Sequence, residues 1–119
     1  MLIAFALIFL LAGCSGVPKL TDPIFSERGG FDLALIAIGA YEPRWFMSEQ
    51  HLNPAESVQV HRDVGAKRSV GVHWGTFNLT DEPLDQPPRD LATAREAANL
   101  PADDFFLLSV VETRKLPAR

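Results

Sequence analysis

The chain has 119 residues, with 11 lysines and arginines, 15 aspartates and glutamates, and a formal net charge of −4 at pH 7. A chain of this length forms at most one small domain, residues 1–119, and its hydrophobic content of 47% is ordinary for a globular protein. The mildly acidic balance, with basic residues scattered along the chain, argues against a nucleic-acid-binding surface. The single cysteine excludes an internal disulfide and a cysteine-rich zinc site.

Two interpretations of the N-terminal apolar run stay open. Residues 1–11 are followed by Ala-Gly-Cys14, a pattern typical of a bacterial lipoprotein signal that is lipidated at the cysteine. No Lys or Arg precedes the run, however, and signal peptides normally begin with basic residues. We therefore favour a buried strand over residues 3–12, with a lipoprotein signal over residues 1–13 as the alternative.

Further apolar segments alternate with helix patterns along the chain. Asn53 is a predicted helix N-cap, Pro54 takes the first helical position, and Glu56 completes a pair typical of a capping box. Other predicted helices cover residues 23–28 and 88–100. The predicted strands cover residues 3–12, 32–38, 69–73 and 105–111, and their continuous apolar character is typical of strands covered on both faces.

Alternating strands and helices predict an α/β fold with one mostly parallel sheet of about four strands. Right-handed crossovers then place the carboxyl ends of the strands at one edge, where α/β folds have their sites. Glycine-containing loops follow three of the strands, at Cys14, Tyr41 and His73. The sequence therefore predicts that these three residues lie at the same edge of the sheet.

His73 is the strongest candidate for chemistry. It ends an apolar strand and begins the run His-Trp-Gly-Thr-Phe of residues 73–77. Neutral imidazole is a good zinc ligand, and the rigid end of a strand fixes its direction. The alternative is a histidine that bonds only to backbone.

Several runs together resemble the C-terminal part of the metallo-β-lactamase-fold hydrolases, in the branch typified by N-acylphosphatidylethanolamine-hydrolysing phospholipase D. The most specific are Tyr-Glu-Pro-Arg-Trp-Phe-Met at residues 41–47 and the His-Trp-Gly-Thr-Phe run. Residues 12–16, 31–47, 50–51 and 73–77 match the family pattern, with Cys14 in place of an aspartate and Ala37 in place of a proline. The resemblance implies one half of a four-layer αββα sandwich.

The resemblance also implies roles for three residues in a zinc-dependent phosphodiester hydrolase. His73 corresponds to a metal ligand, and His51, after Gln50, corresponds to a histidine near the substrate phosphate. His51 could donate a hydrogen bond to a phosphoryl oxygen, or it could be a surface residue at a helix entry. Cys14 stands where the family has a metal-bridging aspartate, so it is either a thiolate ligand or a small buried hydrophobe.

Aromatic residues crowd the two matching loops. Glu42 and Arg44 could pair, and Trp45 with its two successors could cover an acyl-binding groove or anchor the loop to the core. Trp74 and Phe77 are predicted core residues.

In the family, the N-terminal half supplies a His-x-His-x-Asp-His run and a further histidine for a dinuclear site. The three histidines here, His51, His61 and His73, include no His-x-His pair. Our first hypothesis is therefore a C-terminal portion of such a hydrolase, incomplete as a stand-alone catalyst. It would act on a phospholipid or other phosphodiester, associate with a membrane surface and require an absent N-terminal half.

The second hypothesis is a non-catalytic binding or structural protein, lipid-anchored through Cys14. The sequence leaves the location open between the cytoplasm and a membrane surface, with a lipoprotein as the outcome if residues 1–13 are a signal.

Overall fold

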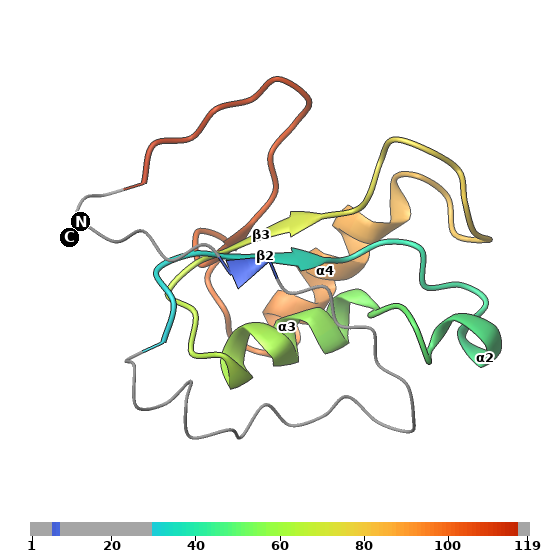
Figure 1. The fold of residues 1–119 in the computed structure, drawn as a ribbon, viewed down its shortest axis with the longest axis horizontal. Coiled ribbons are helices and arrows are strands. Elements are labelled where there is room, and N and C mark those ends of the chain that lie inside the picture. The colour runs from blue at the N-terminus through green and yellow to red at the C-terminus, as the bar shows by residue number, and fades with distance from the viewer. Residues whose placement is uncertain (1–5, 8–29, 117–119) are drawn as a thin grey trace.

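The computed structural model describes residues 6–7 and 30–116 (Figure 1). In chain order the elements of these residues are β1 Ala6–Leu7, β2 Ala34–Ala37, α2 Arg44–Met47, α3 Pro54–Asp63, β3 Ser69–Val72, α4 Gln86–Ala97 and β4 Phe105–Phe106. Cys14 and the predicted helix over residues 23–28 lie outside the described residues. In the part of the chain that is described, no helix combines the length and the hydropathy that a membrane span requires.

The strands of the described residues form one parallel sheet in the order β1-β2-β3-β4. Strands β2 and β3 pair in register from Ala34 opposite Ser69 to Ala37 opposite Val72, so both strands end at the same level. The predicted α/β class with a mostly parallel sheet is confirmed. Of the predicted strand 3–12, Ala6 and Leu7 pair with β2, and the rest of that segment lies outside the described residues.

The last strand is much shorter than predicted. Only Phe105 and Phe106 pair with β3, so the predicted strand 105–111 is wrong beyond its second residue. The chain turns at Ser109, whose backbone N–H donates to the Glu112 carboxylate at 2.7 Å, while the Glu112 N–H donates back to the Ser109 carbonyl at 2.9 Å. These local hydrogen bonds replace strand pairing, and the apolar composition of the segment does not reveal them.

Helices α3 and α4 lie on the same side of the sheet (Figure 1). Successive residues of a strand point to opposite faces, and one face of β2 supplies the core that packs on both helices. The buried core consists of Ala34, Ile36, Ile38, Val58, Val60, Val64, Leu91 and Phe105. His61 belongs to this layer, because it is 5% exposed and its Nδ1 lies 2.8 Å from the Ser69 hydroxyl.

Helix α3 begins as its sequence predicts. The Asn53 side chain accepts from the Glu56 backbone N–H at 2.9 Å, and the Glu56 carboxylate accepts from the Asn53 N–H at 2.8 Å. Helix α4 begins at Gln86, two residues before the predicted start, because Pro87 and Pro88 both fit the first turn, where a backbone N–H has no helical partner. Helix α2 was not predicted from the sequence.

The loops after β2 and β3 touch backbone to backbone. The Ile38 N–H donates to the Val72 carbonyl at 3.0 Å, which extends the strand pairing by one step. Beyond it, a β-carbon added to Gly39 would lie 2.2 Å from the His73 carbonyl oxygen. Only glycine permits this approach, so Gly39 fixes the level at which His73 leaves the sheet.

Replacing Asn53 with alanine should lower the free energy of unfolding by about 1 kcal/mol, because the capping acceptor for the Glu56 N–H is lost. Chemical denaturation measures the change. Asn78→Ala, in an exposed loop position, serves as the control and should leave stability nearly unchanged. Equal effects of the two substitutions would contradict the capping role.

Gly39→Ala should cost roughly 1–3 kcal/mol of stability or more, because the new methyl group would overlap the His73 carbonyl. The comparison is Gly75→Ala, whose new β-carbon meets no atom within 4 Å and carries only the cost of a left-handed alanine. The urea midpoints of the two variants measure the difference in their stability. A Gly39 variant as stable as the wild type would show that the two loops separate easily.

Candidate functional site

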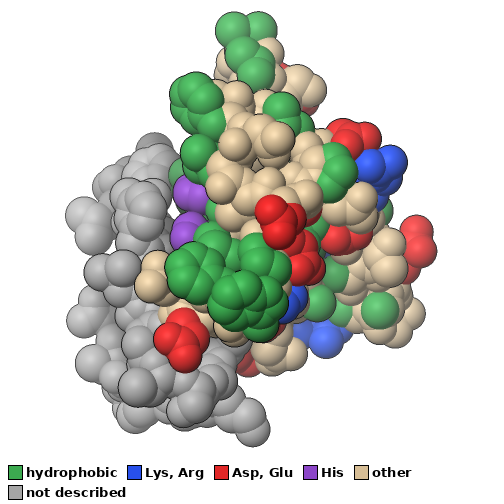
Figure 2. Space-filling model, turned by 90° about the vertical axis from the view of Figure 1, so that its right-hand side faces the viewer, with side chains coloured by type: hydrophobic (Ala, Val, Ile, Leu, Met, Phe, Trp, Pro, Cys, Tyr) green, Lys and Arg blue, Asp and Glu red, His purple; other side chains and the backbone are tan. Residues whose placement is uncertain are grey.

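The carboxyl end of the sheet brings two predicted site residues together. His51 and His73 come from different loops, yet their ring centroids are 5.5 Å apart with an angle of 49° between the rings. His51 is half-buried and His73 is exposed. Figure 2 looks onto this end of the molecule and shows two histidine side chains side by side, next to a group of hydrophobic side chains. Tyr41 and His73 lie at the same edge, as predicted, whereas Cys14 lies outside the described residues.

Arg44 holds the loop that carries His51. Its guanidinium donates to both carboxylate oxygens of Glu56 at 2.8 and 3.0 Å, and to the His51 carbonyl at 3.1 Å. One guanidinium nitrogen, Nη2, contacts both oxygens of Glu56, and the other, Nη1, donates to His51, so the guanidinium links the two residues through charge-assisted hydrogen bonds. The expected side-chain pair of Arg44 with Glu42 is not formed, because Glu42 accepts from the Arg44 backbone N–H instead, at 2.9 Å. The capping glutamate of α3 thus also anchors the His51 loop.

Glu82 is a buried acid that the sequence did not single out. It is 8% exposed, and its carboxylate accepts the backbone N–H groups of Ala40, Tyr41 and Glu42 at 2.6, 3.2 and 3.0 Å. Burial alone would raise the pKa of Glu82, but hydrogen bonds from the Thr80 side chain and from backbone N–H groups outweigh it and lower the pKa below its usual value. Glu82 therefore stays ionised beside the site.

Tyr41 connects the loop after β2 to helix α4. Its hydroxyl donates to the Asp90 carboxylate at 2.5 Å, and Asp90 also accepts from the Gln86 amide at 2.6 Å. Burial, the hydrogen bond to Asp90 and the charge of Asp90 raise the pKa of the Tyr41 hydroxyl far above its usual value. Tyr41 thus acts as a protonated donor that anchors the loop.

The electrostatics of the pair keep His51 neutral at neutral pH. Burial lowers the pKa of His51, the neighbouring His73 lowers it further, and the negative charge of Glu82 opposes both effects. A neutral imidazole carries one N–H donor and one free lone pair. His51 can therefore donate one hydrogen bond or bind a metal ion without first losing a proton.

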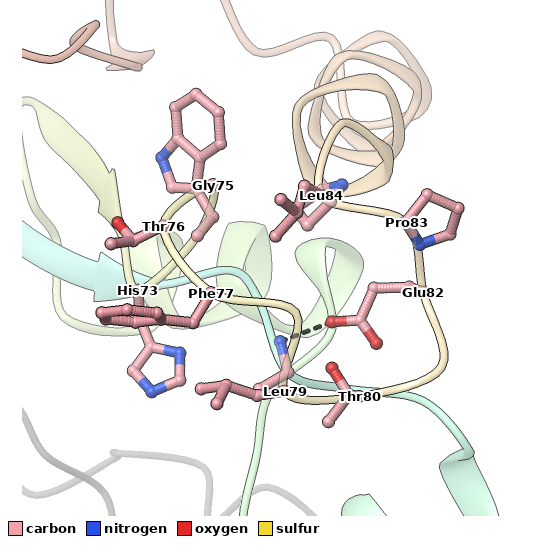
Figure 3. A pocket seen from close by; sticks show the side chains of 12 residues that line it. His73, Gly75, Thr76, Phe77, Leu79, Thr80, Glu82, Pro83 and Leu84 are labelled. Atoms are coloured by element: carbon pink, nitrogen blue, oxygen red, sulfur yellow. Dashed lines mark hydrogen bonds between the residues drawn. The ribbon is translucent and has the colours of Figure 1, made fainter.

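A pocket of about 230 Å³ opens beside His73 (Figure 3). His73 and Phe77 lie at one side of it, and Glu82 lies at the other, bonded to the backbone N–H of Ala40. The remaining lining is mostly apolar and includes Leu79 and Leu84. Because sites for whole drug-sized ligands usually measure roughly 300–1,000 Å³, this pocket suits part of a larger molecule.

Several aromatic residues at this end are exposed. Trp45 and Phe46 are 83% and 63% exposed and pack on each other at 5.7 Å, so the expectation that they anchor their loop to the core is wrong. Phe77 is 72% exposed, which also contradicts its predicted core position. Trp74 does pack against the core, and its indole N–H donates to the Gly71 carbonyl at 3.1 Å.

The described residues do not form a complete metal centre. Within residues 6–7 and 30–116, no three His, Cys, Asp or Glu side chains lie together in a way that could hold a metal ion. Zinc takes three or four protein ligands, and the His51–His73 pair offers two imidazoles. The donor set of the described residues is therefore too small for zinc.

Comparison with known proteins agrees with this geometry. Residues 7–74 match the beta-lactamase superfamily domain. The chain is 53% identical over 77 residues to N-acyl-phosphatidylethanolamine-hydrolyzing phospholipase D 1 of Caenorhabditis elegans, a match that covers 61% of this chain and 22% of that protein. It is 41% identical over 87 residues to an uncharacterised protein of Mycobacterium tuberculosis, covering 71% of this chain and 23% of that protein.

A third relative is the mitochondrial N-acyl-phosphatidylethanolamine-hydrolyzing phospholipase D of Saccharomyces cerevisiae, 39% identical over 87 residues, covering 71% of this chain and 19% of that protein. The chain spans about a fifth of the length of these relatives. The domain match covers more than half of the 119 residues, and both histidines of the pair fall within it. The chain belongs to the beta-lactamase superfamily and is a metallo-β-lactamase-fold protein similar to the N-acylphosphatidylethanolamine-hydrolysing phospholipases D.

Proposed function

We propose that this chain forms the C-terminal portion of a zinc-dependent hydrolase that cleaves a phosphodiester bond of a phospholipid. One observation carries the proposal: His51 and His73, from two separate loops, stand with their rings 5.5 Å apart at the carboxyl edge of the sheet. The substrate class is supported by the relatives in worm and yeast, whose names describe hydrolysis of N-acylphosphatidylethanolamine.

The two histidines would have different tasks. His73 is exposed at the rim of the pocket and would be one of the zinc ligands. His51, whose pKa is lowered mainly by burial, would donate its N–H to a phosphoryl oxygen and so fix the orientation of the phosphodiester. The apolar wall of the pocket would hold part of the lipid next to the reacting phosphorus.

We further propose that the chain is incomplete as a catalyst by itself. Zinc takes three or four protein ligands, and His73 would supply one of them. The other ligands would come from residues outside the described ranges, Cys14 among them, or from a preceding part of a longer protein. The short span of the chain on its relatives supports this proposal.

A chimera tests the proposal. In the Caenorhabditis elegans relative, the segment matched by this chain is replaced with the corresponding residues of this chain. The purified chimera should hydrolyse N-acylphosphatidylethanolamine in a zinc-dependent manner. His73→Ala should also lower its zinc content, and His51→Ala should reduce kcat by roughly 10²-fold or more with zinc retained.

Gln59→Ala, at an exposed position of α3, is the control for the chimera and should leave turnover unchanged. The isolated 119-residue chain, supplied with zinc, should show no turnover of the same substrate. A folded chimera that fails to hydrolyse the lipid while the parent enzyme does so would refute the proposed function. Turnover by the isolated chain, lost in His73→Ala, would refute its incompleteness.

The proposal includes contact with a membrane surface. A phospholipid substrate lies in a bilayer, and hydrophobic side chains gather at the end of the molecule that carries the histidine pair (Figure 2). Trp45 and Phe46 are the exposed aromatic pair there, and aromatic side chains of this size bury large apolar areas when they enter a lipid interface.

Removing both rings with Trp45→Ala and Phe46→Ala should weaken binding to phosphatidylethanolamine-containing vesicles by roughly tenfold or more, because each ring contributes about 1.5–3 kcal/mol on burial. Vesicle co-sedimentation of the chain measures the change. The control is Val110→Ala with Val111→Ala, an apolar pair on another loop that is 87% and 99% exposed and should bind as the wild type does. Unchanged binding after loss of both aromatic rings would exclude this surface as the membrane contact.

A further inference from the structure

We infer that Glu82 is a positioning residue for the His51–His73 pair, acting through backbone groups rather than on a substrate. The catalytic role of the two histidines rests on the proposed function. The way in which Glu82 positions them does not depend on that function. Glu82 lies 31 residues after His51 in the chain, in the loop between β3 and α4, and its carboxylate points inward to the loop after β2.

The carboxylate of Glu82 accepts hydrogen bonds from three consecutive backbone N–H groups. One oxygen accepts from Ala40 at 2.6 Å and Tyr41 at 3.2 Å, and the other accepts from Glu42 at 3.0 Å. Charge-assisted hydrogen bonds of this kind are roughly twice as strong as neutral ones. Both oxygens are used, so a side chain with a single acceptor oxygen cannot satisfy all three N–H groups.

These hydrogen bonds stabilise a backbone conformation at residues 40–42 that would otherwise be unfavourable in free energy. Ala40 has a φ of 62° and His73 a φ of 61°, both in the left-handed region that costs non-glycine residues energy. The Ala40 N–H is the closest of the three donors to Glu82. Glu82 therefore stabilises the left-handed turn at Ala40, directly after the glycine whose backbone meets the His73 carbonyl.

From this turn, contacts lead to both histidines. On one side, Gly39 lies against the His73 backbone and limits where His73 can move. On the other side, Glu42, whose N–H is held by Glu82, accepts from the Arg44 backbone N–H, and the Arg44 guanidinium donates to the His51 carbonyl. One buried carboxylate thus holds the 40–42 turn, which is joined to the His73 backbone through Gly39 and to the His51 carbonyl through Glu42 and Arg44.

If Glu82 contributed only to the stability of the domain, its replacement would lower the free energy of unfolding but leave the distance between the His51 and His73 rings unchanged in the folded state. A positioning carboxylate sets that distance. Glu82→Gln should therefore separate the rings even where the core stays folded, because Gln presents one acceptor oxygen and an NH₂ group to the three donors.

The experiment uses NMR of the full 119-residue chain. In the wild type, nuclear Overhauser contacts should join the ring protons of His51 and His73, which follows from their 5.5 Å ring separation. In Glu82→Gln these contacts should be lost, and the amide signals of Ala40 and Glu42 should move upfield, while methyl signals of the core remain native. No metal and no substrate is needed, so the outcome is independent of the proposed hydrolysis.

Two control variants separate positioning from stability and from charge. Val60→Ala, a core truncation, should lower the urea midpoint yet keep the contacts between the histidine rings. Asp81→Asn removes the neighbouring exposed charge and should also keep them. If Glu82→Gln does not fold, Glu82→Asp carries the test: it keeps the charge but is one methylene shorter, so the Glu42 amide should shift and the ring contacts weaken. Intact ring contacts in the folded Glu82 variants, or their equal loss in Val60→Ala, would overturn the inference.

Discussion

The in-register parallel pairing of β2 and β3 is the constraint on which the site depends. Because Ala37 lies opposite Val72, both strands end at one level, and the loops that follow leave the sheet together. The Ile38–Val72 hydrogen bond and the contact of Gly39 with His73 extend this alignment beyond the strands. A shift of one residue would turn Ile36 and Ile38 away from α3 and α4, so the same core that stabilises the sheet also sets the height of His73.

Polar contacts rather than apolar packing then shape the loops. The 39–47 segment is held by Glu82 at its beginning, by the Tyr41–Asp90 hydrogen bond, and by the Arg44–Glu56 pair at its end. Acidic side chains supply all three of these connections: Glu82 is buried, and Asp90 and Glu56 are partly exposed. Removing one partner from such a network costs more than the pair contributes, because the other group is left without a partner.

Much of the fold follows from local sequence rules. The Asn53–Glu56 capping box marks the start of α3, and continuous apolar runs locate β2 and β3, since both signals act within a few residues. Parallel pairing predicted Tyr41 and His73 at one edge of the sheet. It did not predict that His51 lies beside His73, because helix α2, which precedes His51, was not recognised in the sequence. Glu82 could not be predicted, because a glutamate beside Pro83 in a polar loop looks like a solvent-exposed turn until the loop 40–42 is folded against it. The exposure of Trp45, Phe46 and Phe77 was likewise not predictable, since aromatic residues usually lie in cores.

The arrangement of contacts also bears on how a metal centre could be assembled from separate parts. His51 and His73 are held by groups that all lie within residues 39–82: Gly39, Arg44, Glu56 and Glu82. No contact in that series depends on a residue that the family resemblance assigns to an N-terminal half. The proposed zinc ligand His73 and the proposed phosphate-binding residue His51 are therefore both positioned by contacts within this part of the chain. A ligand that is already held in place loses less conformational freedom when a metal ion and its remaining ligands bind, which favours assembly of the complete site.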